Sequence, residues 1–342
     1  MTAIRERSRN LGPNLEELYL CIDSSDSEDH IPITFLQTPC PRLHTIILEH
    51  APLACIRHTL TPSSSPSIIP PFFLPSLRKL HLVRDLEYPS SSRQMSFREI
   101  LDTISCTPSL VELHIQYAIF LLDGSESIFY PNAPLTRIPL LQSLSLKFVD
   151  ATNTSLLLDS LDLPMLNKLS IQMEENNEET THWLLRLAAP SQAGLPRFPN
   201  LRHLDLRAFN VDGPALFPFI RAMYALPRLT ALMLSSPPCG SLGSKLFELL
   251  SAPSPSPSPD APSNTGLWIL PNLRALCIQH CRDITGHELL QLVRSRAAAA
   301  AAVAEEGQGV KAIRFLRIGG CYAVDNEVVE MIRAVVDIVA TT

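Results

Sequence analysis

The stretch Leu273-Arg274-Ala275-Leu276-Cys277-Ile278, with a proline two residues before it, shows the pattern that decides the fold. Its form is Leu-x-x-Leu-x-Leu/Ile, and close variants return ten times along the chain of 342 residues. Self-similarity at steps of tens of residues is the signature of a repeat architecture. The first residues of the ten copies are, in order, Leu15, Leu43, Leu77, Leu110, Leu141, Leu166, Leu201, Leu229, Leu273 and Ile313.

The copies are spaced irregularly, by 25 to 44 residues, so insertions of varied length must separate the shared cores. Most copies carry a proline two residues before the first leucine. These prolines are Pro13, Pro41, Pro75, Pro108, Pro139, Pro164, Pro199, Pro227 and Pro271. Proline fixes φ and lacks an N–H, which suits the turn before a strand better than the strand itself.

The phrase itself has the period of a strand, because its last two leucines are two residues apart and therefore share one face. One such strand cannot bury its leucine face alone, so neighbouring coils must stack. The pattern predicts an α/β solenoid of about ten irregular repeats, with a parallel sheet inside and helices or loops outside. We expect one continuous solenoid over 1–342.

Some of the returns between strands have helical periodicity. Residues 97–104 place Phe97, Ile100, Leu101 and Ile104 on one stripe, and Ser96 is a suitable N-cap. Helices are also predicted over 216–226, 244–251 and 288–296, whereas the remaining returns are interpreted as loops.

Two segments lengthen the last steps between repeats. Residues 251–263 are rich in proline and serine, which predicts a disordered insertion. Residues 297–309 begin with a run of alanine and end in Gly307-Gln308-Gly309, which predicts a prolonged helix followed by a break.

Composition narrows the function classes. The chain is 46% hydrophobic with a net charge of −6, so it can build a large core and lacks the clustered Lys/Arg of a nucleic-acid-binding protein. No apolar run reaches the length of a membrane span, and the first ten residues lack the apolar core of a secretory signal. The eight cysteines are interpreted as reduced thiols, which fits the cytoplasm or nucleus.

The last two copies follow a sharper pattern than the others. Residues 276–285 read Leu-Cys-Ile-Gln-His-Cys-Arg-Asp-Ile-Thr, residues 316–325 read Leu-Arg-Ile-Gly-Gly-Cys-Tyr-Ala-Val-Asp, and a predicted helix follows each. This pattern resembles the cysteine-containing leucine-rich repeat of F-box/leucine-rich-repeat proteins. The irregular, proline-led copies upstream look like those of the large fungal families of such proteins. The resemblance implies a leucine-rich-repeat horseshoe.

The resemblance also implies a role. In that family an F-box of about fifty residues binds a Skp-type adaptor of a cullin ubiquitin ligase, and the repeats bind the substrate. The chain contains no F-box, so an adaptor is expected as a partner only if an F-box lies upstream of Met1. The leading hypothesis is a protein-interaction module that recognises ligase substrates. The alternative is a stand-alone leucine-rich-repeat scaffold or regulator with no link to ubiquitin.

An enzyme is a third possibility, which would require motifs of catalysis or cofactor binding. The twelve glycines form neither a P-loop nor a G-x-G-x-x-G fingerprint, and no G-x-S-x-G or H-E-x-x-H occurs. Cys277, His280 and Cys281 are close in sequence, but four residues along a strand span ~13 Å, too far for two ligands of one zinc. We therefore expect no enzyme, no cofactor and no metal site, with Cys281 and Cys321 buried as small apolar groups.

The face opposite the leucines is the candidate binding surface. Its side chains flank the last two leucines of each phrase and, in the central strands, mix both charges with histidine, which suits protein recognition. The candidates on this concave face are Lys79, His81, Glu112, His114, Gln116, Lys147, Lys168, His203, Asp205 and Arg207. Positions at the same phase outside this central set include Tyr19, Met233, Gln279 and Arg317. The expected partner is a protein, with no nucleic acid and no membrane.

Overall fold

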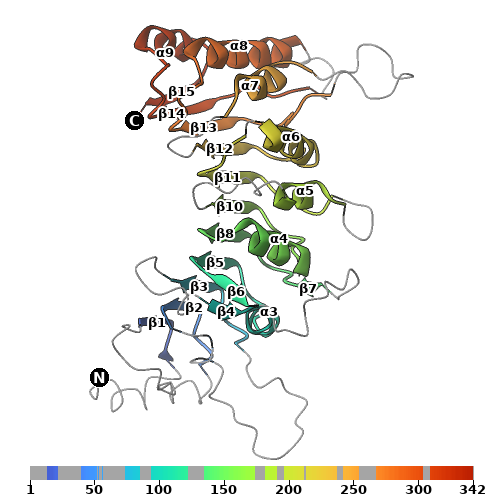
Figure 1. Ribbon diagram of the computed structural model, residues 1–342, viewed down its shortest axis with the longest axis vertical. Coiled ribbons are helices and arrows are strands. Elements are labelled where there is room, and N and C mark those ends of the chain that lie inside the picture. The colour runs from blue at the N-terminus through green and yellow to red at the C-terminus, as the bar shows by residue number, and fades with distance from the viewer. Residues whose placement is uncertain are drawn as a thin grey trace, which may run out of the picture. The chain divides into compact units, whose positions relative to one another are not determined.

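The computed structural model shows an α/β chain built of two compact units (Figure 1). It describes residues 14–21, 40–51, 53, 56, 74–84, 94–121, 135–173, 182–190, 196–211, 213–236, 242–253, 267–302 and 309–341. Unit 1 comprises Met1–Val149 and Leu156–Leu166, and unit 2 comprises Asp150–Ser155 and Asn167–Thr342. Each unit is solenoid-like, because its strands stack side by side and the chain returns behind them. The expected single solenoid over 1–342 stays a prediction.

Unit 1 contains a parallel sheet in the order β1-β2-β3-β5-β8. The strands are β1 (Glu17–Cys21), β2 (Thr45–Glu49), β3 (Lys79–Val83), β5 (Glu112–Gln116) and β8 (Ser143–Lys147). Two short parallel ribbons accompany it, formed by β4 (Gln94–Ser96) with β6 (Ile119–Leu121) and by β7 (Thr136–Arg137) with β9 (Leu161–Asp162).

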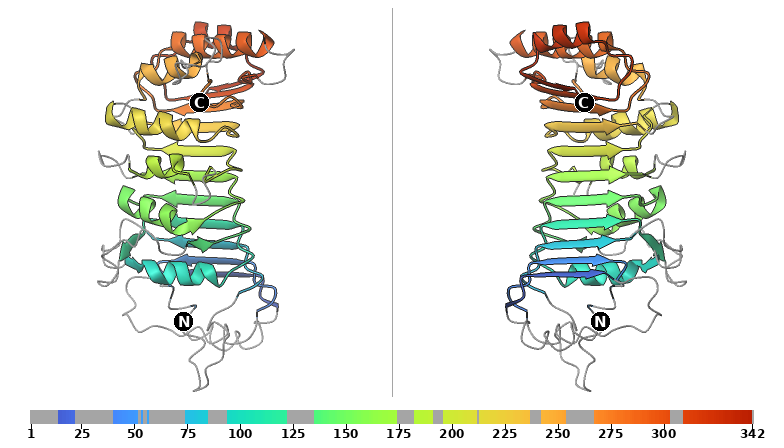
Figure 2. Two further views of the ribbon diagram at one scale, coloured as in Figure 1. Left: turned by 90° about the vertical axis from the view of Figure 1, so that its right-hand side faces the viewer. Right: turned by 90° about the vertical axis from the view of Figure 1, so that its left-hand side faces the viewer.

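Unit 2 contains a parallel sheet in the order β10-β11-β12-β13-β14-β15. Its strands are β10 (Lys168–Gln172), β11 (His203–Arg207), β12 (Ala231–Ser235), β13 (Ala275–Gln279), β14 (Phe315–Gly319) and β15 (Ile338–Thr341). Figure 2 shows the strands of each unit running in one direction. The ten repeated phrases therefore each form a strand, as predicted, and each strand begins two residues after the first leucine.

The proline that precedes most phrases lies in a turn of constant geometry. In eight copies the first leucine of the phrase donates its N–H to the carbonyl three residues earlier, for example Leu43 to Cys40 at 3.1 Å and Leu273 to Leu270 at 3.0 Å. Proline is then the second residue of a four-residue turn, where its fixed φ is favourable. This turn sets the point at which each strand begins, so the strands share one register.

The leucines of successive strands form the core. In unit 1 Leu80 pairs in register with Leu113, and Leu113 with Leu144; all three side chains are fully buried. In unit 2 Leu204 and Leu232 hold the same place. Each burial removes apolar surface from water, worth about 1.5–3 kcal/mol per leucine.

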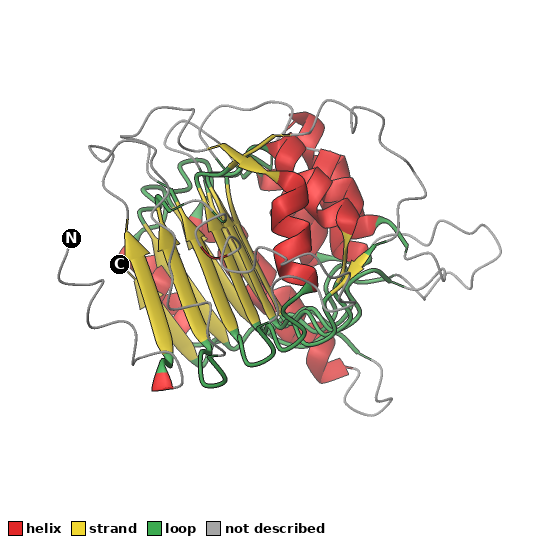
Figure 3. Cartoon of the chain, turned by 90° about the horizontal axis from the view of Figure 1, so that it is seen from below, coloured by secondary structure: helices red, strands yellow, loops and turns green. Residues whose placement is uncertain are grey.

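Helices pack against the leucine side of each sheet and leave the other side without a helix among the described residues (Figure 3). Unit 1 has α3 (Phe97–Ser105), and α4 (Ala151–Ser160) contributes residues to both units. Unit 2 has α5 (His182–Ala188), the short 3₁₀ helix η5 (Gly213–Ala215), α6 (Leu216–Tyr224), α7 (Ser244–Ser251), α8 (Gly286–Ala302) and α9 (Asn326–Arg333). Neighbouring helices in unit 2 pack in the pairs α5–α6, α7–α8 and α8–α9.

The predicted helices are confirmed with small shifts of their ends. Ser96 caps α3 by accepting the N–H of Glu99 at 3.3 Å, as expected. Helix α8 begins at a reciprocal cap, in which Thr285 donates both its N–H and its hydroxyl to the carboxylate of Glu288. Asp325 caps α9 by accepting the N–H of Val328 at 2.8 Å.

The interpretation of the remaining returns as loops was wrong at α4 and α5, and β15 was not predicted. Helix α4 is rich in Thr, Asn and Ser, which are poor helix formers, but Asp150 accepts the N–H of Asn153 at 2.7 Å. Helix α5 buries Trp183 and Leu184. Strand β15 lacks the repeated phrase and pairs with β14 at the edge of the unit 2 sheet. Tertiary packing therefore decides these three elements, against weak local signals.

The two predicted insertions fall only partly within the described residues. Of 251–263, the stretch 254–263 lies outside them; of 297–309, the alanine run Ala297–Ala302 forms the C-terminal part of α8, and 303–308 lies outside them. In the described part of the chain, no helix has the length and apolar character needed to cross a membrane.

A buried arginine joins the chain on either side of the gap between α7 and β13. The guanidinium of Arg296 in α8 donates to the carbonyls of Leu250 and Ile269 from Nη1, at 3.3 and 3.2 Å, and to that of Leu270 from Nη2, at 2.7 Å. Its side chain is fully buried and lies over the ring of Trp268. Burial lowers the pKa of Arg296 to about 10.

Candidate protein-binding surface

The side of each sheet away from the leucines is called the strand face of unit 1 and the strand face of unit 2. It consists of the first, third and fifth residues of each strand. Register pairing places these side chains in three rows across each sheet, so that His81 lies beside His114 and Met233 beside Cys277. The surface is therefore a grid, in which each side chain has neighbours two residues away on its own strand and neighbours in register on the adjacent strands.

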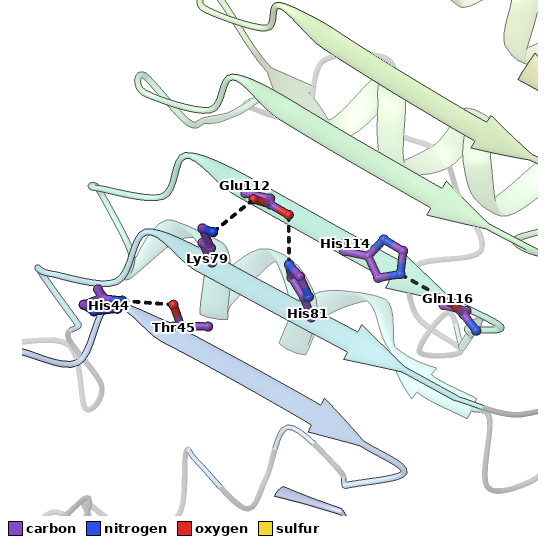
Figure 4. Close-up of polar contacts among 7 residues, drawn as sticks. All are labelled: His44, Thr45, Lys79, His81, Glu112, His114 and Gln116. Carbon is purple, nitrogen blue, oxygen red and sulfur yellow. Dashed lines mark hydrogen bonds and ion pairs between the residues drawn. The ribbon is translucent and has the colours of Figure 1, made fainter. Parts of the chain in front are cut away.

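The strand face of unit 1 carries a polar cluster on β3 and β5 (Figure 4). The carboxylate of Glu112 lies 3.0 Å from Nε2 of His81 and 3.9 Å from Nζ of Lys79. The rings of His81 and His114 are in contact, with centroids 5.3 Å apart. His114 in turn has Nε2 3.3 Å from the side-chain oxygen of Gln116. The negative charge of Glu112 therefore offsets the positive charge of Lys79 on the same strand face.

The surroundings of His114 shift the pKa of its ring. Its ring is partly buried, and this loss of hydration lowers its pKa below the usual value; the neighbouring His81 and Lys147 act in the same direction. The hydrogen bond to Gln116 and the charge of Glu112 oppose the shift. Near neutral pH the ring is therefore uncharged, with one nitrogen available to accept a hydrogen bond from a partner.

At the end of β5 and β8, two aromatic rings stack. Tyr117 and Phe148 have centroids 4.2 Å apart and nearly parallel planes. Both residues have positive φ, 54° and 53°, which is unusual for bulky side chains. The N–H of Tyr117 donates to the carbonyl of Lys147 at 2.9 Å, so the left-handed residue extends the ladder of backbone bonds. This pair was not predicted from the sequence, although an aromatic residue stands directly after both strands.

The strand face of unit 2 is organised around Asp205 on β11. Its carboxylate accepts from Nε of Arg207 at 3.1 and 3.2 Å, from Nη2 of the same arginine at 3.0 Å, and from the hydroxyl of Ser170 at 3.1 Å. Arg207 also reaches the next strand, where Nη2 lies 3.9 Å from Sδ of Met233. Asp205 thereby holds the guanidinium over the middle row of the sheet.

A second arginine approaches the same row from the opposite side. Arg317 on β14 is in register with Cys277 on β13, and its Nε is buried without a hydrogen-bond partner in the part of the chain that the structure describes. Burial raises the pKa of the Cys277 thiol, while the charges of Arg317 and Arg207 oppose that shift. Both guanidinium groups are therefore within electrostatic reach of Cys277. The two arginines flank a floor formed by Met233 and Cys277.

The cysteines that follow β13 and β14 occupy equivalent positions. Cys281 is fully buried, and its thiol donates to the carbonyl of Gln279 at 3.1 Å; Cys321 is half-buried and donates to that of Gly319 at 3.5 Å. The expectation that both are buried holds fully for Cys281 and in part for Cys321. A hydrogen bond between the two thiols, together with burial, raises the pKa of Cys281, and the same bond lowers the pKa of Cys321.

All ten predicted binding residues lie on the strand faces. Unit 1 holds Lys79, His81, Glu112, His114, Gln116 and Lys147, and unit 2 holds Lys168, His203, Asp205 and Arg207. In unit 1 the structure joins Lys79, His81 and Glu112 directly. In unit 2 it joins Asp205 with Arg207, while partial burial and the charge of Lys168 together lower the pKa of His203. Whether these residues bind a partner stays a prediction.

The arrangement offers recognition by charge, hydrogen bonds and exposed rings. Tyr19 on β1 is 59% exposed at the same row as His81, so an aromatic side chain stands at the first strand of unit 1. Among the described residues, no three His, Cys, Asp or Glu side chains gather as metal ligands would.

Comparisons with known proteins give little beyond this geometry. No family model and no curated protein matches the chain. Among solved structures, a chain of the crystal structure of the yeast Rad7 and Elc1 complex is similar over 100% of this chain and 85% of that one, with 16% identity and a TM-score of 0.46.

Proposed function

We propose that this chain is a protein–protein interaction module of the leucine-rich-repeat class, which binds its partner through the strand faces. One observation carries the proposal. In both units the leucines fill the core and the helices pack on that side, while the polar residues of each strand stand in aligned rows on a side that no described helix occupies. Rows of fixed, mixed side chains on a rigid sheet are suited to recognising another protein.

The finer proposal is that the module recognises substrates of an F-box-type, Skp–cullin ubiquitin ligase. Its support is the pair of cysteine-containing repeats at β13 and β14. There Cys281 and Cys321 occupy equivalent places after the strands, and each is followed by a capped helix. The alternative is a leucine-rich-repeat scaffold or regulator outside the ubiquitin system, which would use the same surface. We expect a non-enzymatic protein of the cytoplasm or nucleus in either case.

The first experiment asks which proteins accompany the chain in its own cells. The protein is tagged at its C-terminus at the native locus, purified and identified by mass spectrometry. Peptides from upstream of Met1, recovered with a Skp-type adaptor and a cullin, support the ligase role. Recovery of other proteins without adaptor or cullin contradicts that role and supports the stand-alone scaffold.

The second experiment tests whether the strand faces make the contact. Replacing His114, His203 and Asp205 together by alanine should leave the fold intact and reduce recovery of the co-purified proteins several-fold, because all three lie on the strand faces. The control replaces Arg221 and Arg294, which are exposed on α6 and α8, and should leave recovery unchanged. Equal recovery from both variants would exclude the strand faces as the binding surface.

A further inference from the structure

The strand face of unit 2 differs from the rest of this acidic chain in the sign of its charge. The outward positions of β10, β11 and β14 carry Lys168, Arg207 and Arg317, and the described outward positions of the unit 2 sheet hold one acid, Asp205. That acid is already bound by Arg207 and Ser170. The net charge of the whole chain is −6, so this positive surface is a local feature rather than a reflection of composition.

The loops that enter the strands extend the same charge. In the described stretches 196–202, 226–230, 267–274 and 309–314, every charged residue is Arg or Lys. The loop that enters β15 differs, because it carries Asp337, whose carboxylate lies 4.0 Å from Nε of Arg314. Three of these arginines stand immediately before β11, β13 and β14 and are exposed: Arg202, Arg274 and Arg314. Their backbone carbonyls and N–H groups are tied to neighbouring loops, for example Arg314 N–H to the Arg274 carbonyl at 2.8 Å.

The positions of these arginines follow from the sheet. Neighbouring strands are about 4.8 Å apart, so Arg274 and Arg314 stand about one strand apart and Arg202 about two strands from Arg274. An extended polypeptide that crosses the strands repeats its side chains on one side every ~6.5–7 Å. Long arginine side chains can span that difference, so successive acidic side chains can each meet a guanidinium.

Arg207 and Arg317 supply a second set of donors on the sheet itself. Nε of Arg317 is buried without a hydrogen-bond partner among the described residues, which is unfavourable. Arg207 bonds to Asp205 through Nε and Nη2, which leaves Nη1 for another acceptor. Between them lies the uncharged floor of Met233 and Cys277. A carboxylate placed there would be bound by guanidinium groups from two sides.

We propose that unit 2 binds an extended acidic segment of its partner protein, with one carboxylate between Arg207 and Arg317 and flanking acids on Arg202, Arg274 and Arg314. This rests on the proposed role as an interaction module and names the chemistry of the partner. Nucleic acid fits the surface less well. Asp205 lies within the row, and Phe315 is the one aromatic residue at the described outward positions of β10–β14, whereas single strands are held by stacking on several rings.

The test uses the full chain and fluorescence anisotropy with a labelled peptide of six Glu-Ser repeats. The peptide should bind, with affinity falling as salt is raised, and the matched Gln-Ser peptide should not. Arg317→Gln should weaken binding roughly tenfold, because a charged hydrogen-bond donor is lost. The triple variant Arg202→Gln/Arg274→Gln/Arg314→Gln should weaken it at least as much. Thermal melts of the variants should match the parent.

A charge-matched control lies on the helix side of the same unit. Arg221, Lys245 and Arg294 are exposed on α6, α7 and α8, and their triple replacement by Gln changes the net charge equally. It should alter affinity less than twofold. Equal weakening by both triple variants would overturn the proposal. It would also be overturned if the Glu-Ser peptide did not bind, or if a twelve-nucleotide oligothymidylate bound more tightly than that peptide.

The outcomes separate this inference from the proposed function. Proteins that co-purify in a strand-face-dependent way, together with no binding of the Glu-Ser peptide, would leave the interaction role standing and remove the acidic-segment proposal. Binding of the peptide that depends on Arg317, with cellular partners indifferent to the strand faces, would show an acid-binding surface but contradict its use in partner recognition.

Discussion

The strand faces of the two units share a backbone and differ in how their charges are balanced. In unit 1, Glu112 lies between Lys79 and His81, and the uncharged His114 fills the next place in the row. In unit 2, Asp205 is bound by Arg207, and no described residue accepts from the buried Nε of Arg317. In the unit 1 cluster the acid is paired with two basic side chains of its own strand face, whereas the unit 2 face keeps a buried donor without an acceptor among the described residues.

The difference shows that the repeat fixes positions and leaves chemistry open. The same three outward positions per strand are filled by rings and a carboxylate in one unit and by guanidinium groups in the other. Because the residue types at the outward positions do not affect the leucines on the other side of the sheet, the surface can vary while the fold is kept. The partner chemistry of such a chain must therefore be read unit by unit.

The largest effect should come from placing a charge in the core of one unit. Leu204→Asp buries a carboxylate at a site that is 1% exposed and in register with Leu169 and Leu232, at a cost of more than about 4 kcal/mol. Hydrogen exchange should show lost protection in β10–β12. The mirror variant Leu113→Asp should do the same for β3, β5 and β8 in unit 1. A melt and exchange pattern equal to the parent in either variant would contradict the register.

A smaller effect is expected from the buried arginine of unit 2. Arg296→Met keeps the length of the side chain but leaves the carbonyls of Leu250, Ile269 and Leu270 without their donor. The free energy of unfolding should fall by about 2–4 kcal/mol, measured by urea denaturation. The control Arg294→Met, on an exposed position of the same helix, should change it by less than about 0.5 kcal/mol. If Arg296→Met left the free energy of unfolding unchanged, these hydrogen bonds would make no net contribution to stability.

The strands could be predicted from the sequence because their signal is redundant. Period-2 leucines, the preceding proline turn and ten repetitions all point to the same element, and the outward residues follow from the phase alone. Helices α3 and α8 were predictable because their apolar stripes and caps agree. Helix α4 was not, because Thr, Asn and Ser have weak helix propensity and its stability comes from burying residues such as Leu157.

The binding candidates were predictable only as positions. The alternation of leucines places His81 and Arg317 on the strand face. It does not predict that Glu112 forms a hydrogen bond with His81, or that Nε of Arg317 lacks an acceptor among the described residues. Pairing across strands that are distant in sequence depends on which coils are neighbours and on side-chain direction. The Tyr117–Phe148 stack likewise needs a left-handed backbone at two bulky residues, which propensity argues against.

The smallest predicted effect is a difference between the two strand faces in how much stability the protein loses through their histidines as the pH falls. Burial, His81 and Lys147 lower the pKa of His114 in the folded protein, so the unfolded chain binds its proton more tightly. The stability contributed by the neutral ring is complete above the unfolded pKa of ~6.5 and is lost as pH falls below it. His114→Gln should therefore reduce the loss of stability between about pH 6.5 and 5, measured by urea denaturation at each pH. His203→Gln is the matched change in unit 2; there the histidine is more exposed, so the reduction should be smaller. An equal pH profile for His114→Gln and the parent would show that this histidine does not link acid to folding, and would remove proton sensitivity as a difference between the two strand faces.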